Sequence, residues 1–489
     1  MMYWDMLLSP KRFREKETVE RAENDERSPF KKDYDTVCNS TILRRLQDKA
    51  QVFPLEQEDY ARTRLTHSIE VMSIAESLGM KARNIIMKHD KKFLSESRRK
   101  RDYVKELLDE IPTILKTVSL LHDMGNPPFG HLGEQIIGDW FAHNLRNLAI
   151  NSDGLLVYKS GSDPNDSLVY KLKGKYFNDL TNFEGNAQLF RLVTKLNLFI
   201  DEYGMNLTFP VMASFIKYPT NSSSIDKKKL ICKKVGYFSS EEDLYQKINE
   251  TLGLNGYRHP LAFLLEAADD IAYLTADIED AHRKGLITID KIVKYFSEEK
   301  SDLLVDQVLK EISNYKMAAI KMEYEDVEGY VMNRTRVLIK GLMINSIYVA
   351  FDNAYDDIME CRFNDELLNC SAASTITRIL RKIEKENIHY CSQILENKTR
   401  AYSVLTKLLE IYVPATVNWK EEDDKNKDTD RNLLYLSLSK NYRYICKQAN
   451  KRATTEEEKI YNKLLLVTDQ ISGMTDTHAL SVYKMITAN

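Results

Sequence analysis

Apolar residues recur at helical spacing through five long segments of this chain, at 61–79, 112–124, 260–282, 334–360 and 373–413. Such spacing gives each helix an apolar face that must be buried against another element. Gly79 is expected to end the first helix, and Pro260 to lie in the first turn of the third. Strand signals are limited to short stretches such as 207–210 and 235–238. We therefore expect an all-α fold with minor short β-hairpin elements.

The composition narrows the class of protein. Apolar residues make up 43% and charged residues 29% of the 489 residues, which excludes a disordered chain and allows a large buried core. Lys and Arg number 70 against 73 Asp and Glu, so the net charge of −3 leaves nucleic-acid binding to local patches. The six cysteines form no CxxC pair, and no stretch is apolar enough to span a membrane. We expect a cytoplasmic protein with reduced thiols.

The strongest local signal is the adjacent pair His122-Asp123, at the end of an apolar helix and before a turn of Gly and Pro residues. An imidazole and a carboxylate placed there can face one ion. Mixed nitrogen and oxygen sites suit Mn²⁺, Fe²⁺, Co²⁺ or Zn²⁺, and an oxygen-richer site suits Mg²⁺. The alternative is a charged pair that only caps a helix. A second pair, His89-Asp90, lies in a basic stretch and is expected at the surface.

Further candidate ligands lie elsewhere in the chain. His67 lies on an apolar helical face, where a lone histidine is more often a core residue. Asp269 and Asp270 interrupt an apolar helix, although they could equally be surface acids paired with Lys or Arg. Asp269, Tyr273 and Asp277 share one face at spacings of four. At 1.5 Å per residue, Asp269 and Asp277 are ~12 Å apart, so one ion cannot hold both.

The pattern of His67, His122-Asp123 and Asp269 resembles that of the HD-domain phosphohydrolases. Longer segments resemble the bacterial deoxyguanosinetriphosphate triphosphohydrolases (dGTPases), in the same order along the chain. These segments are 44–71, 122–134, 183–188, 217–219, 258–281 and 471–476. The resemblance implies a helical HD-domain fold.

The positions of the motifs and the loop-like composition of two stretches indicate a division of the chain. We expect an N-terminal arm at 1–34 and an HD core at 35–285, with insertions near 151–175 and 219–229. A C-terminal helical region at 286–489 would contribute to oligomer contacts and to the substrate pocket.

The resemblance implies that four side chains hold a divalent metal, namely His67, His122, Asp123 and Asp269. Mn²⁺ or Mg²⁺ is expected, and Fe²⁺, Co²⁺ or Zn²⁺ are the alternatives. Two residues, His131 and Glu134, are expected to serve catalysis beside the α-phosphorus. A histidine oriented by a carboxylate is a sensible proton-transfer unit. From the residues alone, Glu134 would be a first-turn helix acid favoured by the helix dipole.

The substrate-binding residues that the resemblance implies are Gln51, Arg64, Asn186, Lys217, Tyr218, Lys234, Tyr273, Asp277 and Arg443. Arg64, Lys217 and Lys234, together with Tyr218, would hold a triphosphate. Lys234 is preferred to Lys233 because of its spacing to Gly236. Tyr273 and Asp277 would contact the deoxyribose, and the two amide side chains would read the base or the sugar.

The relatives that this chain resembles form hexamers, in which a C-terminal residue completes a neighbour's pocket; Arg443 is the candidate here. Some relatives bind single-stranded DNA. The segment 81–101 carries nine Lys and Arg residues and could serve that purpose, although a solvated helix face is the more ordinary explanation.

The implied reaction is metal-dependent hydrolysis of dGTP to 2′-deoxyguanosine and tripolyphosphate, by attack of water at the α-phosphorus. Alternatives are another HD enzyme, such as a 5′-nucleotidase or a cyclic-nucleotide phosphodiesterase, a broader dNTP triphosphohydrolase, and a nucleotide-sensing or nucleic-acid-binding protein without turnover. Asn126 stands where the eukaryotic SAM-and-HD-domain dNTPase has histidine, and no SAM domain is recognised, which favours the bacterial branch.

Overall fold

The structure, a computed structural model, describes most of the chain. The described residues are 1–14, 25–52, 62–89, 97–150, 155–158, 168, 172, 174–197, 202–388, 391–420 and 430–487. Helices dominate these residues, which confirms the predicted all-α class. Their single sheet is the antiparallel pair β1 (Leu148–Ile150) and β2 (Leu156–Tyr158), which matches the expected minor hairpin.

The helices up to residue 285 are α1 (Trp4–Leu7), α2 (Pro29–Cys38), α3 (Thr41–Arg45), η1 (Leu46–Asp48), α4 (Arg64–His89), α6 (Arg98–Asp109), α7 (Ile111–Leu121), α8 (Gly130–Asn144), α10 (Lys175–Thr181), α11 (Gly185–Arg191), η3 (Leu192–Leu196), α12 (Phe209–Phe215), η4 (Leu230–Cys232), η5 (Ser239–Glu241), α13 (Glu242–Leu252) and α14 (Pro260–Arg283). Those that follow are α15 (Ile289–Ser297), α16 (Leu303–Lys321), α17 (Val327–Met359), α18 (Ser374–Asn387), α19 (Ser392–Val417), α20 (Asp430–Ser437), α21 (Lys440–Arg452), α22 (Glu456–Ser472) and α23 (Asp476–Thr487).

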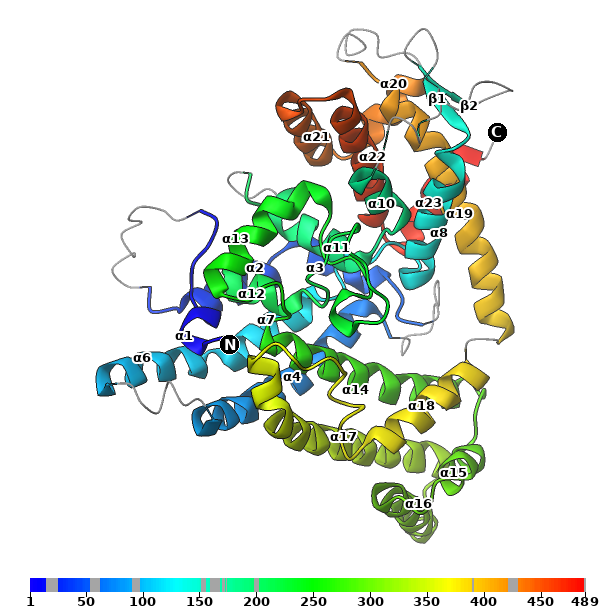
Figure 1. Cartoon of the computed structure of the whole chain (residues 1–489). Helices are drawn as coiled ribbons and strands as arrows, with labels where there is room; N and C mark the ends of the chain where they lie inside the picture. Colours follow the sequence, from blue (N-terminus) through cyan, green and yellow to red (C-terminus); the bar gives the residue numbers. More distant parts are fainter. Residues whose placement is uncertain are drawn as a thin grey trace.

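Helices α4, α7 and α14 form the centre of the molecule (Figure 1). Helix α4 packs against both α7 and α14, and α17 covers α4 and α14 from the other side. In the view of Figure 1, α15 to α18 lie below these helices, and α19 to α23 lie above them with α8 and the hairpin. Apolar side chains fill the space between the central helices, for example Val71, Leu115 and Ile271.

Gly79 does not end the first predicted helix, because α4 continues to His89. A Cβ atom on Gly79 would lie 3.1 Å from the Cα atom of Pro112 and 3.0 Å from Leu115. The glycine therefore allows α4 and α7 to approach closely, and its role is in helix packing rather than helix termination. The third predicted helix matches α14 to within one residue, with Pro260 in its first turn.

The predicted strands are wrong. Residues 207–210 lead into α12, and the backbone N–H of Thr208 donates to the Asp33 side chain at 2.9 Å rather than to a neighbouring strand. Residues 235–238 form bends in which Gly236 donates to Thr220 O at 2.9 Å. The predicted helix at 373–413 is two helices, α18 and α19. The extended backbone of Cys391 caps the second helix and separates the two.

Packing crosses the predicted boundary at 285, since α14 contacts α17 and α18. The division into an arm, a core and a C-terminal region therefore stays a prediction. Most of the predicted insertion at 151–175 lies outside the described residues, whereas 219–229 forms a series of turns. Among the helices described, none combines the length and the apolar character needed to cross a membrane.

Candidate active site

Three side chains from three central helices meet at one point. His67 comes from α4, His122 directly follows α7, and Asp269 comes from the middle of α14. One ligand atom from each lies within 4.8 Å of the other two. The Nε2 atom of His67 is 3.0 Å from Asp269 Oδ1, and that of His122 is 3.5 Å from the same oxygen. The packing of α4, α7 and α14 thus assembles a His-His-Asp cluster.

The orientation of His122 suits a metal ligand. Its Nδ1–H donates to Ser119 O at 2.7 Å, which leaves Nε2 facing Asp269. This Nε2 atom is buried and has no hydrogen-bond partner among the described residues. Metal-ligating histidines commonly fix their tautomer through such a bond from the other ring nitrogen. The donor set therefore fits a divalent cation.

Asp123 lies beside this cluster. Its Oδ2 is 2.9 Å from Arg64 Nη1 and 3.7 Å from His122 Nε2, and Oδ1 accepts from Asn126 Nδ2 at 2.6 Å. Burial opposes ionisation of Asp123, but Arg64 and His122 outweigh it and lower the pKa of this carboxyl to about 2. The pKa of Asp269 is also held well below its usual value, by His122 and Lys217 against the effect of burial. Both carboxylates are thus ionised and can bind a cation.

His131 and Glu134 form a second unit in the first turns of α8. The Nδ1–H of His131 donates to Glu134 Oε2 at 2.8 Å, and Glu134 Oε1 accepts from the backbone N–H of Gly185 at 2.9 Å. The hydrogen bond and charge of Glu134 raise the pKa of His131. Burial would raise the pKa of Glu134, but His131 lowers it. Glu134 is buried whereas the imidazole is exposed, so the histidine is a fixed and accessible proton donor.

Gly185 is required at this position. A Cβ atom there would lie 2.3 Å from Asn126 Oδ1 and 2.5 Å from Glu134 Oε1. The same segment supplies Glu184, which pairs with Lys234 at 3.0 Å and accepts from Asn186 Nδ2 at 2.9 Å. The predicted motif at 183–188 therefore adjoins the His131–Glu134 unit on the side of Lys234.

The predicted phosphate-binding cations lie beside these acids. Lys217 Nζ is 3.4 Å from Asp269 Oδ2, and burial is outweighed by Asp269 and Glu266, so the pKa of this lysine is raised. Lys233 instead pairs with Glu366 at 3.5 Å. Since Glu184 adjoins Glu134 and pairs with Lys234, the geometry favours Lys234 over Lys233 as the residue near His131.

Arg258 has a positioning role that the sequence reasoning missed. Its Nε–H donates to Lys217 O at 2.7 Å, its Nη1 pairs with Glu266 at 2.5 Å, and its guanidinium lies over the Tyr218 ring at 5.8 Å. The side chain is fully buried. Arg258 opens the segment 258–281 that resembles the dGTPases and directly precedes His259 and Pro260, and this position was the available signal.

Tyr273 and Asp277 continue along α14 from Asp269, as their spacing predicted. Asp277 is buried, and its Oδ1 has no hydrogen-bond partner among the described residues. Burial, Glu384 and Asp280 raise the pKa of this carboxyl well above its usual value. Asp270 faces differently, because its Oδ2 accepts from Arg381 at 3.0 Å.

The remaining predicted residues make no described contact with the His-His-Asp cluster. Gln51 lies at the end of the segment that pairs with residues 62–63, and its Oε1 is buried without a partner within the described ranges. Arg443 lies on α21, where its guanidinium is 5.4 Å from the centre of the Tyr435 ring. The structure does not bring Arg443 to the His-His-Asp cluster of its own chain. His89 pairs with Asp352, and Asp90 lies outside the described residues.

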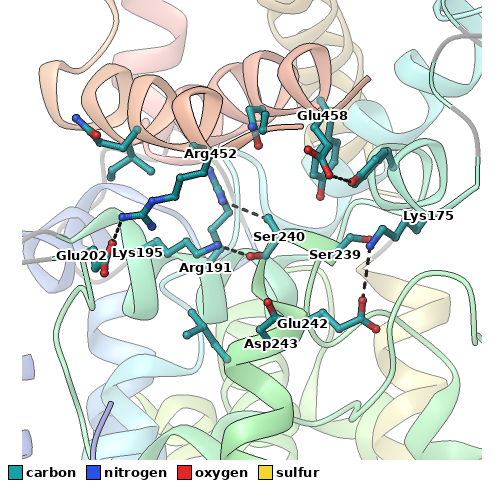
Figure 2. A pocket seen from close by; sticks show the side chains of 18 of the residues that line it. Lys175, Arg191, Lys195, Glu202, Ser239, Ser240, Glu242, Asp243, Arg452 and Glu458 are labelled. Atoms are coloured by element: carbon teal, nitrogen blue, oxygen red, sulfur yellow. Dashed lines mark hydrogen bonds and ion pairs between the residues drawn. The ribbon is translucent and has the colours of Figure 1, made fainter. Parts of the chain in front are cut away.

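A cavity of about 790 Å³ lies elsewhere, between α10, α13 and the helices α21 and α22 (Figure 2). None of the predicted site residues lines it. Its cations already have acidic partners, since Arg191 pairs with Glu241 at 2.9 Å and Lys195 pairs with the same glutamate at 3.1 Å. Figure 2 also shows Arg452 beside Glu202. The cavity is therefore balanced in charge and separate from the site.

Comparisons with known proteins agree with this geometry. A family model described as HD domain matches residues 64–155, which include His67, His122 and His131. Proteins named deoxyguanosinetriphosphate triphosphohydrolase-like protein are 38% identical over 485 residues in Listeria innocua and in Listeria monocytogenes, covering 99% of each chain. A Yersinia pestis protein named deoxyguanosinetriphosphate triphosphohydrolase is 28% identical over 495 residues, covering 94% of each chain.

Proposed function

Because this chain belongs to the family of deoxyguanosinetriphosphate triphosphohydrolase-like HD proteins, we propose that it hydrolyses dGTP to 2′-deoxyguanosine and tripolyphosphate. The chain is an enzyme, a hydrolase of the HD class. The observation that carries the proposal is the pairing of two units, a His-His-Asp cluster and a buried Glu134 that orients His131. Metal binding and proton transfer are the two chemical capabilities that this hydrolysis needs.

His67, His122, Asp123 and Asp269 would hold a divalent metal, for which we propose Mn²⁺ or Mg²⁺. Such an ion, when bound, supplies Lewis-acid polarisation of the phosphoryl group and a more acidic water. The chain contributes the ionised carboxylates and the fixed Nε2 atom of His122.

Arg64, Lys217 and Lys234 would bind the triphosphate oxygens. Each of these cations faces an acid in the absence of substrate, namely Asp123, Asp269 and Glu184 respectively. Guanidinium and ammonium groups form their strongest hydrogen bonds with such anionic oxygens. Tyr218 would line the same surface, held in place by Arg258.

His131 would donate its proton to the departing 5′-oxygen of the nucleoside. Glu134 raises the pKa of His131, which favours the protonated imidazole, and it fixes the ring through Nδ1, so Nε2–H would be the donor. Cleavage at the α-phosphorus releases the three phosphates as one product.

The sugar would lie along α14. Asp277 has an Oδ1 atom without a partner among the described residues, and it would accept a hydrogen bond from the 3′-hydroxyl. The Tyr273 ring would occupy the space that a 2′-hydroxyl needs and would thereby reject ribonucleotides. Gln51 and Asn186 would contact the base or the sugar.

Product analysis tests this proposal. The metal-free protein is incubated with each dNTP and with GTP, with Mn²⁺ or Mg²⁺ added, and the products are separated by chromatography. Deoxyguanosine and tripolyphosphate from dGTP alone are expected. Equal turnover of all four dNTPs would replace the proposal with a broader dNTP triphosphohydrolase. A monophosphate product would indicate a different HD reaction.

We also propose a hexamer in which Arg443 reaches a neighbouring subunit, and single-stranded DNA as a second ligand of the basic segment 81–101. Light scattering measures the oligomeric state. Fluorescence anisotropy with a labelled oligonucleotide measures DNA binding, and part of this segment lies outside the described residues.

A further inference from the structure

The first residue of α23 lies against the turn that leads into α8, the helix that carries His131 and Glu134. Asp476, the first residue of α23, is 2% exposed and accepts two backbone N–H groups. Its Oδ1 accepts from Phe129 at 2.9 Å, and its Oδ2 accepts from Ala50 at 2.9 Å. One carboxylate thus joins three segments that are far apart in the sequence.

Lys49 makes a second connection at the same place. Its ammonium donates to Asn126 O at 2.6 Å and to Ser472 O at 2.8 Å, and the side chain is 2% exposed. Burial lowers the pKa of Lys49 to about 7, while the nearby charge of Asp476 acts in the opposite direction. Lys49 therefore ties the loop after His122 to the end of α22.

The residues that are held in this way adjoin the proposed chemistry. Phe129 has a φ of 64°, a left-handed conformation that is strained for a non-glycine residue. Gly130 follows with a φ of 59°, and a Cβ atom on it would lie 2.2 Å from Arg64 Nη2. His131 comes next in the chain. The direction of its imidazole therefore depends on a strained turn, which needs external support to persist.

The other two contacts act on substrate-binding candidates. Ala50 precedes Gln51, and the backbone carbonyl of Lys49 accepts from the N–H of Arg64 at 2.8 Å. Arg64 in turn pairs with Asp123. Loss of the hydrogen bonds made by Asp476 and Lys49 would therefore displace Gln51 and Arg64. The polar atoms of Asp476 and Lys49 themselves do not point at the cluster.

We propose that Asp476 and Lys49 are positioning residues, by which the C-terminal segment fixes the Phe129–Gly130 turn and the 49–51 segment of the active site. This inference rests on the proposed function, because it assigns the turn to His131 as proton donor. It requires both carboxylate oxygens of Asp476, since each accepts from a different segment.

The test compares Asp476→Asn with Asp179→Asn. Asp179 is also a buried carboxylate whose two oxygens both accept hydrogen bonds, from Ser222, Ser239 and Tyr461, but none of these partners is a candidate site residue. An amide offers one acceptor oxygen, so each variant loses one bond or more. We expect kcat of Asp476→Asn on dGTP to fall by about 10-fold to 100-fold, because small misplacement of a catalytic group has effects of this order. Asp179→Asn should keep kcat within about 2-fold of the wild type when both are assayed well below their Tm, since it leaves the geometry of the site unchanged.

Two further readouts separate positioning from stability. The basic limb of the kcat–pH profile should move to lower pH in Asp476→Asn, because looser His131–Glu134 contact lowers the pKa of His131. Amide hydrogen exchange in a peptide spanning Phe129 should become faster in this variant and not in Asp179→Asn. Unchanged kcat, pH profile and exchange, or equal losses of kcat in both variants, would overturn the proposal.

If the proposed function itself is wrong, the wild-type protein will not release tripolyphosphate from dGTP. The hydrogen-exchange experiment does not depend on that activity and still tests whether Asp476 stabilises the Phe129–Gly130 turn. If Asp476→Asn does not fold, Lys49→Met decides. This variant should fold and keep the hydrogen bond from Phe129 N–H to Asp476. Its kcat should fall by about 3-fold to 10-fold at full metal content, because the catalytic groups are displaced less than in Asp476→Asn. Wild-type kcat in that variant would overturn the proposal.

Discussion

Replacing Glu134 by glutamine tests the proton-transfer unit with little change in shape. Glu134 makes two hydrogen bonds with different oxygens, one from Gly185 N–H at 2.9 Å and one from His131 Nδ1–H at 2.8 Å. Glutamine has one acceptor oxygen. Because Gly185 N–H is buried and needs an acceptor, the amide NH₂ of the introduced glutamine would then face His131. The variant therefore removes the charge and the acceptor that hold His131 protonated.

The size of the effect follows from the contact. A hydrogen bond between charged groups is worth about 1.5–3 kcal/mol. The His131 side chain is 77% exposed, so solvent screens the pair and the lower end of this range is expected. Loss of an oriented general acid lowers kcat by on the order of 10²-fold.

The assay is the release of deoxyguanosine from dGTP as a function of pH, at saturating substrate. Glu134 raises the pKa of His131, so the protonated donor is present below the raised pKa and is lost as the pH rises through it. In Glu134→Gln the basic limb of kcat should therefore move to lower pH, with KM changed less than about 3-fold and metal content unchanged. The control is Glu458→Gln on the surface of α22, which should behave as the wild type. Wild-type kcat and an unmoved basic limb in Glu134→Gln would refute the role of His131 as the acid.

Three other substitutions test separate parts of the site. His122→Ala should abolish both turnover and metal binding while the helical circular dichroism is kept, and full activity would remove His122 from the site. Tyr273→Ala should reduce the dGTP/GTP ratio of kcat/KM by about 10-fold or more, and an unchanged ratio would contradict its role against ribonucleotides. Gly185→Ala should lower the free energy of unfolding by about 1–3 kcal/mol through overpacking and should lower kcat by displacing Glu134, as chemical denaturation and the dGTP assay would show.

The helices were predictable where a local signal fixes them. Pro260 and the apolar run that follows it determine α14, and the observed helix matches. Gly79 misled the prediction because the sequence does not show whether a glycine ends a helix or lets a neighbour approach; here the neighbour is Pro112 on α7. The short strand at 207–210 failed for a similar reason, because the partner that satisfies Thr208 N–H is Asp33, a side chain 175 residues away.

The site shows the same contrast. His131 and Glu134 are three residues apart in one helix, a spacing that allows their contact, but it was the family resemblance that predicted the pair; from the residues alone Glu134 was a first-turn helix acid. Lys49 and Asp476 act through backbone carbonyl and N–H groups, which nearly every residue type provides, and Arg258 also donates to a backbone carbonyl. No side-chain pattern therefore marks their partners, and only the folded structure identifies them.

In this site each buried cation is paired with a carboxylate, and neither charge would be stable there without the other. Arg64, Lys217 and Lys234 are buried or half-buried, as are the carboxylates they face. A buried charge without a partner is strongly unfavourable, so each of these cations stabilises a site that must contain several acids even before any ligand binds. The proposed reaction uses the same groups in a second arrangement, with the acids toward a divalent metal and the cations toward the triphosphate. Since the metal and the substrate would replace existing partners of opposite charge, the site can open to its ligands without leaving either set of charges uncompensated.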